Sequence, residues 1–263
     1  MPKHIVMWSG GITSWATARW VIDRHGPADV TLLFADTNAE DPDLHRFNAE
    51  ASAQLGIPVT RVADPKERDP WQVFEDKQWL GNTRLAQCSL ELKIQPCRTW
   101  LAANTDPADT MLYVGIDWTE THRLPVITEG WLPWTVDAPL TRPPYADKTM
   151  LLAELKALHI RRPNLYRLGF EHNNCGALCV KGGQGHWLRV LKVFPDRFAK
   201  IEAFEQRMRA KLGDVSILRD RTDGTLKPLT LAALRQRADA AAEEDDQLDL
   251  FDIGGCGCFT DAA

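Results

Sequence analysis

The segment 9–14, SGGITS, joins a short apolar run at 4–8 to a stretch with helical spacing of apolar residues at 12–25. Its glycines allow the backbone to approach a ligand closely. The helix behind it offers free N–H groups and the positive end of its dipole, which suits phosphate. The segment is neither a Walker A motif nor a GxGxxG fingerprint, and an ordinary strand–helix turn is the alternative. The candidate phosphate-binding residues are Ser9, Gly10, Gly11, Thr13 and Ser14.

Charged residues follow two later apolar runs. Asp36 comes directly after the run 30–35, and Asp117 directly after the run 111–116. Ligands of open parallel sheets bind beyond the carboxyl ends of the strands, so we expect both residues near the phosphate loop. The alternative for Asp36 is a helix-capping carboxylate in a strand–helix turn.

Six cysteines form the second group of candidates: Cys88, Cys97, Cys175, Cys179, Cys256 and Cys258. The first four are spaced C-x8-C and C-x3-C, which is not the spacing of a zinc knuckle. Thiolates on short loops from separate parts of a chain suit an iron–sulfur cluster. Structural zinc is one alternative, and buried cysteines acting as small apolar residues are another.

The loop SGGITS resembles the SGGxDS loop of the PP-loop ATP pyrophosphatases, which grip the β,γ-pyrophosphate of ATP and cut at the α-phosphate. Thr13 stands where that family has Asp. The resemblance therefore leaves the Mg²⁺ role, or a catalytic one, to Asp117 or Glu120. FADTN at 34–38 and GIDWTETHR at 115–123 are similar to further segments of the superfamily, which implies that Asp36 lies near the nucleotide and that Arg123 holds a phosphate or sulfate. The alternative for Glu120 and Arg123 is a surface ion pair.

The run CSLELKIQP at 88–96, followed by a late cysteine pair, resembles the phosphoadenylylsulfate reductase-like branch of that superfamily. This branch includes the DNA phosphorothioation sulfurtransferase and phage-borne relatives. The resemblance covers roughly residues 4–212 and implies a [4Fe–4S] cluster on Cys88, Cys175 and Cys179, with Lys93 near the cluster or the phosphates. The fourth ligand is Cys97, a cysteine of the tail, or no protein residue. For Cys256 and Cys258 we consider two roles: a catalytic relay of sulfur, or ligation of the cluster.

Strand and helix signals alternate through the first third of the chain, which predicts an α/β fold with a parallel, Rossmann-like sheet. We expect a nucleotide-binding domain over 1–148 and a basic, mostly helical region containing cysteines over 149–238. An acidic tail with Cys-Gly-Cys follows over 239–263.

The net charge of −5 is unevenly distributed. Residues 151–238 carry 17 Lys and Arg against 8 Asp and Glu, whereas the segments on both sides are acidic. A basic block of this kind predicts a surface for a polyanion, and we expect nucleic acid to bind through residues 156–211. Solvated helix faces are the alternative.

Together these features predict an enzyme, an ATP-dependent sulfurtransferase that adenylates a nucleic acid or nucleotide. Its expected cofactors are ATP, Mg²⁺ and a [4Fe–4S] cluster, with Zn²⁺ as the alternative metal, and a protein can supply the sulfur. One alternative function is a thiol-dependent reductase of phosphoadenylylsulfate or adenylylsulfate. Another is a non-catalytic nucleotide- and cluster-binding subunit of a modification or defence complex. No apolar run is long enough to cross a membrane, and a cytoplasmic location is expected.

Overall fold

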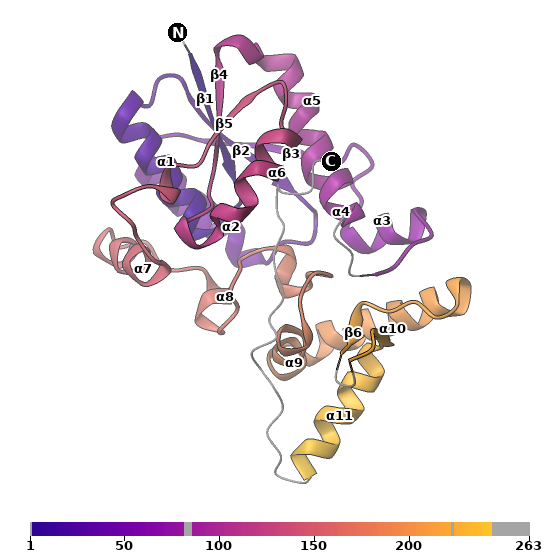
Figure 1. Ribbon diagram of the computed structural model, residues 1–263. Helices are drawn as coiled ribbons and strands as arrows, with labels where there is room; N and C mark the ends of the chain where they lie inside the picture. Colours follow the sequence, from indigo (N-terminus) through magenta and orange to yellow (C-terminus); the bar gives the residue numbers. More distant parts are fainter. Residues whose placement is uncertain (1, 82–85, 222–223, 244–263) are drawn as a thin grey trace.

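A five-stranded, fully parallel sheet forms the centre of the computed structural model, which describes residues 2–81, 86–221 and 224–243 (Figure 1). The strand order is β3-β2-β1-β4-β5. The α/β, Rossmann-like prediction is confirmed. The strands are β1 (Lys3–Trp8), β2 (Val30–Asp36), β3 (Val59–Ala63), β4 (Thr110–Val114) and β5 (Thr135–Asp137).

The strand order places a topological switch point between β1 and β4. The chain leaves β1 toward β2 and β3, and later returns to the other side of β1 with β4 and β5. Loops at the carboxyl ends of β1 and β4 therefore diverge and leave a crevice between them, where such sheets bind ligands.

Helices cover both faces of the sheet, because β1, β2 and β4 are apolar on both sides and must be buried twice. One face packs against α1 (Ile12–His25), α2 (Pro42–Leu55) and α7 (Lys148–Ala157). The other packs against η1 (Leu90–Ile94), α5 (Gln95–Asn104) and α6 (Leu124–Gly130). Leu151 and Leu155 of α7 belong to the first of these cores, so packing continues across residue 148, where the sequence pattern predicts a domain boundary.

A second core lies outside the sheet and joins α3 to the C-terminal helices. In Figure 1 helices α9, α10 and α11 form a lobe below the sheet. The remaining elements are α3 (Pro70–Asp76), α4 (Gln87–Ser89), η2 (Pro107–Asp109), η3 (Trp118–Arg123), η4 (Pro139–Thr141), α8 (Asn164–Arg167), η5 (Cys175–Ala177), α9 (Gln184–Val193), α10 (Pro195–Leu212), β6 (Leu218–Asp220), β7 (Lys227–Leu229) and α11 (Leu231–Glu243). No helix within the described residues has the length and apolarity that a membrane crossing requires.

A buried carboxylate fastens this lobe. Glu205 of α10 is fully buried and accepts hydrogen bonds from the backbone N–H of Ile217, at 2.8 Å, and of Leu231, at 2.6 Å. It thereby satisfies the backbone next to β6 and at the start of α11. Burial raises the pKa of Glu205 above its ordinary value of 4.5.

We expect Glu205→Ala to lower the free energy of unfolding by roughly 2–4 kcal/mol, because it leaves two buried N–H groups without an acceptor. Asp196→Ala, at an exposed position on the same helix, should cost less than about 1 kcal/mol. Since the folded state holds the Glu205 proton to higher pH than the unfolded chain, the contribution of this group to stability falls as pH rises above 4.5. Urea unfolding of both variants tests this account, and equal losses would contradict it.

Candidate functional site

The phosphate loop predicted from SGGITS lies between β1 and α1. Gly10 has a φ of 71°, and a Cβ there would lie 2.9 Å from Leu44 Cγ, so both backbone and space require glycine. Gly11 is the residue that precedes the first turn of α1. The Ser14 hydroxyl donates to Gly11 O at 2.8 Å, and the Ser9 hydroxyl donates to Ser14 Oγ at 3.2 Å. The two serines therefore hold the loop in shape.

The end of β4 closes on this loop. A Cβ on Gly115 would lie 2.7 Å from Ser14 N, so only glycine allows β4 to approach the first turn of α1 so closely. Beside this contact is a cavity of about 540 Å³, partly open to solvent, which we call the switch-point pocket. It is lined by Met7, Ser9, Thr13, Val114, Gly115, Ile116, Glu120, Arg123, Ile127, His172 and Asn174.

An ion pair forms one wall of this pocket. Arg123 contacts Glu120 within η3, and the side chain of Arg123 is only 18% exposed. The surface ion pair considered above is therefore present, but it faces a cavity. Asp117 is placed differently, since its carboxylate accepts from Thr119 N at 2.9 Å and caps η3.

His172 lines the same pocket without a hydrogen-bond partner on its ring among the described residues. Burial, together with nearby titratable groups, lowers the pKa of His172 to about 3. These groups are Lys148, His186, Arg123 and Lys93. The crevice therefore combines a neutral imidazole with a positive potential, which suits phosphate groups.

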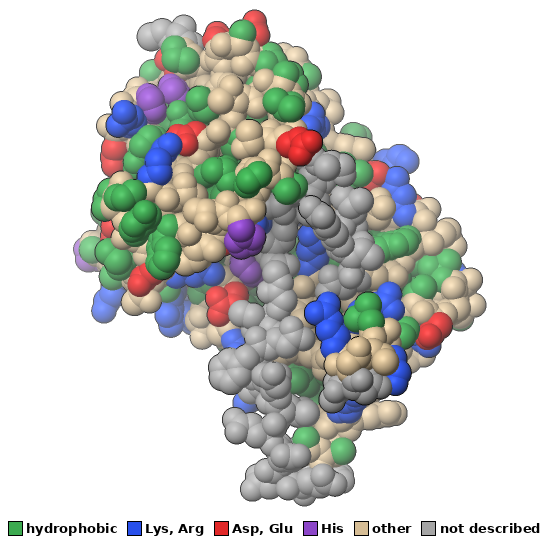
Figure 2. Space-filling view, in the orientation of Figure 1, with side chains coloured by type: hydrophobic (Ala, Val, Ile, Leu, Met, Phe, Trp, Pro, Cys, Tyr) green, Lys and Arg blue, Asp and Glu red, His purple; other side chains and the backbone are tan. Residues whose placement is uncertain are grey.

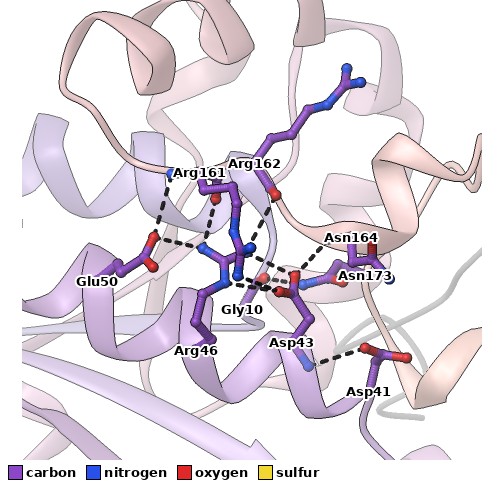
Figure 3. Close-up of polar contacts among 9 residues, drawn as sticks. All are labelled: Gly10, Asp41, Asp43, Arg46, Glu50, Arg161, Arg162, Asn164 and Asn173. Carbon is purple, nitrogen blue, oxygen red and sulfur yellow. Dashed lines mark hydrogen bonds and ion pairs between the residues drawn. The ribbon is translucent and has the colours of Figure 1, made fainter.

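Two residues from the C-terminal half hold the phosphate loop from outside. Asn173 is buried and donates from Nδ2 to Gly10 O at 2.8 Å (Figure 3). Tyr166 of α8 accepts from Ile12 N at 3.3 Å. The Oδ1 atom of Asn173 has no hydrogen-bond partner within the described part of the chain, so a buried acceptor remains beside the loop.

Asp36 has a structural role in the carboxyl-end turn of β2. It is buried and accepts from Asn38 N at 2.9 Å and from Arg61 Nε at 2.8 Å. It does not cap α2, whose N-cap is Asp41 instead. Asp36 lines neither the switch-point pocket nor the pocket described next.

Three cysteines from two separate parts of the chain line one small cavity, which we call the thiol pocket. Cys88 precedes η1, and Cys175 and Cys179 come from the loop after α8. Lys93 and Lys181 line it as well, and Lys93 is only 5% exposed. Since cations favour the thiolate form, this setting suits cysteines that act as nucleophiles or ligands.

The backbone at Cys175 is strained and held in place. Cys175, Gly176 and Ala177 have φ values of 51°, 56° and 68°, a region that non-glycine residues rarely adopt. Cys175 N donates to the Glu40 carboxylate at 2.5 Å, and His186 Nε2 donates to Ala177 O at 2.7 Å. Such conformations cost about 1–3 kcal/mol each and persist where surrounding contacts impose them, often at functional sites.

Cys97 does not join these thiols. It is fully buried in the core between the sheet and α5, where burial raises its pKa far above the ordinary value. The structure thus corrects its assignment as a metal ligand and supports an apolar role. Cys256 and Cys258 lie outside the described residues.

No three His, Cys, Asp or Glu side chains within residues 2–81, 86–221 and 224–243 converge as ligands of one metal ion. A mononuclear zinc site needs four ligands around a point. Cys88, Cys175 and Cys179 line one cavity.

Eight of the predicted site residues line two adjacent pockets: Ser9, Thr13, Glu120 and Arg123 line the switch-point pocket, and Cys88, Lys93, Cys175 and Cys179 line the thiol pocket. Asn174 lines the switch-point pocket and Cys175 the thiol pocket, so one short segment connects them. The sequence reasoning missed His172, Asn173 and Tyr166. The polar run HNN before Cys175 was a usable signal for the first two, whereas nothing in the sequence singles out Tyr166.

No family model matches the sequence, and no curated protein matches it. Among solved structures, the chain is similar to a phosphoadenylyl-sulfate (PAPS) reductase from Candida auris in complex with phosphate. The identity is 15%, the likeness covers 66% of this chain and 81% of that one, and the TM-score is 0.49. It is also similar to an NH3-dependent NAD synthetase from Campylobacter jejuni subsp. jejuni NCTC 11168 in complex with nitrate, at 13% identity over 80% and 83% of the chains and a TM-score of 0.40. Both likenesses are distant, and a functional assignment depends on the residues of the site.

We expect the His172 ring to stay neutral from pH 8 down to about pH 4, because its folded-state pKa is about 3. Its contribution to stability is therefore complete above the ordinary pKa of 6.5 and is lost as pH falls toward 3. Lys148→Ala should raise the pKa by removing a repelling cation, whereas Lys192→Ala on α9 should not change it. Proton–nitrogen NMR titration of the ring measures this, and protonation of the wild-type ring near pH 6.5 would contradict it.

Proposed function

We propose that this chain is a PP-loop-type enzyme that binds ATP across the switch point and cleaves it at the α-phosphate. The observation that carries the proposal is the SGGITS loop at the start of α1, set against Gly115 at the end of β4. Backbone N–H groups of the loop suit the β,γ-phosphates. Arg123 and the surrounding positive charge suit the remaining phosphate charge.

Glu120 is the residue of this pocket best placed for Mg²⁺. It is the one carboxylate among the residues that line the cavity in the described structure, and Thr13, in the position of the family's Asp, lines the same cavity with a hydroxyl. Carboxylate oxygens together with substrate phosphates are the usual ligands of Mg²⁺. Asp117 is a weaker candidate because it does not line this cavity and its Oδ1 already accepts from Thr119 N and Oγ1.

The adjacent thiols favour sulfur transfer as the reaction. An acceptor oxygen attacks the α-phosphorus of ATP and releases pyrophosphate. A hydrosulfide sulfur then attacks the adenylated centre of the acceptor, breaks its bond to that oxygen and releases AMP. The segment from His172 to Cys175 lines both pockets, so sulfur held at the thiol pocket lies next to the adenylated acceptor. A non-catalytic nucleotide-binding role has one point in its favour, the hydroxyl of Thr13 where the family has a carboxylate.

The thiol pocket also fits an iron–sulfur cluster by the chemistry of its donors. Cys88, Cys175 and Cys179 would hold it, with Lys93 and Lys181 offsetting its negative charge. When bound, a cluster with three protein ligands supplies an iron that can take sulfide. With Cys97 in the core, the fourth ligand is a tail cysteine or no protein residue.

Gly11→Val should weaken ATP binding by about 2 kcal/mol, roughly thirtyfold in Kd, because the loss is that of charged hydrogen bonds. Gly11 has a φ of −106°, which valine adopts readily, but its Cβ would lie 3.1 Å from the Tyr166 hydroxyl and would crowd the loop. Ala199→Val, at an exposed site on α10, serves as the control. Calorimetry on folded proteins measures both, and equal affinities, or no binding by the wild type, would remove the PP-loop assignment.

For the cluster, we expect about four irons per chain after anaerobic purification. Cys88→Ala, Cys175→Ala and Cys179→Ala should each lose iron and the visible absorption of the protein. Cys97→Ala should keep both, because its thiol lies in the core. Cys256→Ala and Cys258→Ala identify a fourth ligand in the tail if either loses iron. A colourless protein with one zinc per chain would contradict the cluster.

A further inference from the structure

A broad groove lies along α7 and α8 and shares no lining residue with either pocket. Its volume is about 1070 Å³, partly open to solvent, and Leu152 and Ile160 form part of its lining. We call it the basic groove because its other lining residues include Lys156, His159, Arg161, Arg162 and Arg167. Lys and Arg side chains are visible beside α7 and α8 in Figure 2.

The acidic residues next to the basic groove are already neutralised. Asp43 accepts from two atoms of Arg46 at 2.8 Å and from Arg161 at 3.3 Å, and the hydrogen bonds from Arg46 lower the pKa of Asp43. Glu50 pairs with Arg46 as well. Figure 3 shows this cluster, with the Arg162 side chain extending away from it.

Three cations of the groove are therefore not compensated. Lys156, Arg162 and Arg167 are exposed, and their side chains form no ion pair within the described residues. A solvated helix face normally mixes both signs of charge, whereas the residues that line this groove include no Asp or Glu.

Helix α10, the other basic segment, is different. Arg197 pairs with Asp41, Arg209 with Asp214 and Lys211 with Glu75, and Arg207 lies over the ring of Phe204. Most of its cations thus serve the fold. The charge available to a partner is concentrated on the groove rather than spread over residues 156–211.

We propose that the basic groove binds the phosphate backbone of a nucleic acid. A single phosphate is held by converging, buried donors, whereas these cations are exposed and line one broad groove, which suits contacts to several phosphates. The segment from Arg161 to Arg167 also carries Tyr166, whose hydroxyl contacts Ile12 N at the phosphate loop. A nucleic-acid strand bound in the groove would therefore lie beside the phosphate loop. The idea that this strand is the acceptor of sulfur rests on the proposed function, whereas its binding to the groove does not.

The test is the binding of a fluorescent single-stranded DNA 20-mer to the full-length chain as salt is varied. The association constant K falls as salt rises, and each lost phosphate contact makes the slope of log K against log salt shallower by about 0.7. The double variant Arg162→Ala/Arg167→Ala should make the slope shallower by about 1.4. If the double variant and the wild type bind equally at 1 M salt, the double variant should then bind roughly 25-fold more weakly than the wild type at 0.1 M salt. Both side chains are exposed and unpaired in the described structure, so the fold should persist.

The matched control is Lys192→Ala with Lys200→Ala, which removes the same charge at exposed positions on α9 and α10. It should leave the slope nearly unchanged. Equal effects of both double variants, or a wild type that does not bind DNA or RNA at low salt, would overturn the proposal. ATP binding measured on the same proteins separates the outcomes: Gly11→Val should keep DNA binding, and the groove variant should keep ATP binding.

Discussion

The close approach of β4 to the first turn of α1 is the constraint on which the rest of the site depends. Gly115 permits it, since any Cβ there would meet Ser14 N at 2.7 Å. The approach occurs at the switch point, where the strand order opens a crevice. Because of this close approach, the loop between β1 and α1 forms one wall of the switch-point pocket, and Glu120 and Arg123 lie on another wall. The α/β sheet thus supplies both the phosphate loop and the charge that faces it.

The C-terminal half completes this site rather than forming a separate unit. Asn173 and Tyr166 contact the phosphate loop. The carboxylate of Glu40 fixes the strained turn at Cys175 by accepting a hydrogen bond from the backbone N–H of Cys175. Arg197 joins the same turn to α2 by contacting Asp41 and Gly176 O. A displacement of the C-terminal lobe would therefore alter the phosphate loop and the thiol pocket together. This coupling is what a reaction needs if one pocket activates an acceptor and the other delivers sulfur.

Local patterns in the sequence were enough to predict the sheet and the loop, because strand β1 is a continuous apolar run and helix α1 has apolar residues at helical spacing and a clear end signal at Gly26. They did not predict β5, which is only three residues long, or the helical run through η1 and α5, where proline and mixed periodicity obscure the pattern. Asp36 and Asp117 follow strands as expected, but the backbone of their own turns uses their carboxylates. Cys97 has motif spacing yet points into the core, a distinction that depends on which face of α5 meets the sheet.

Product analysis by phosphorus NMR tests the central claim most directly. The full chain, purified without oxygen, is incubated with ATP, Mg²⁺, sulfide and single-stranded DNA. Cleavage at the α-phosphate predicts AMP and pyrophosphate in equal amounts, and Arg123→Ala should reduce both. Release of ADP and orthophosphate instead, or ATP left intact under all of these conditions, would contradict the account.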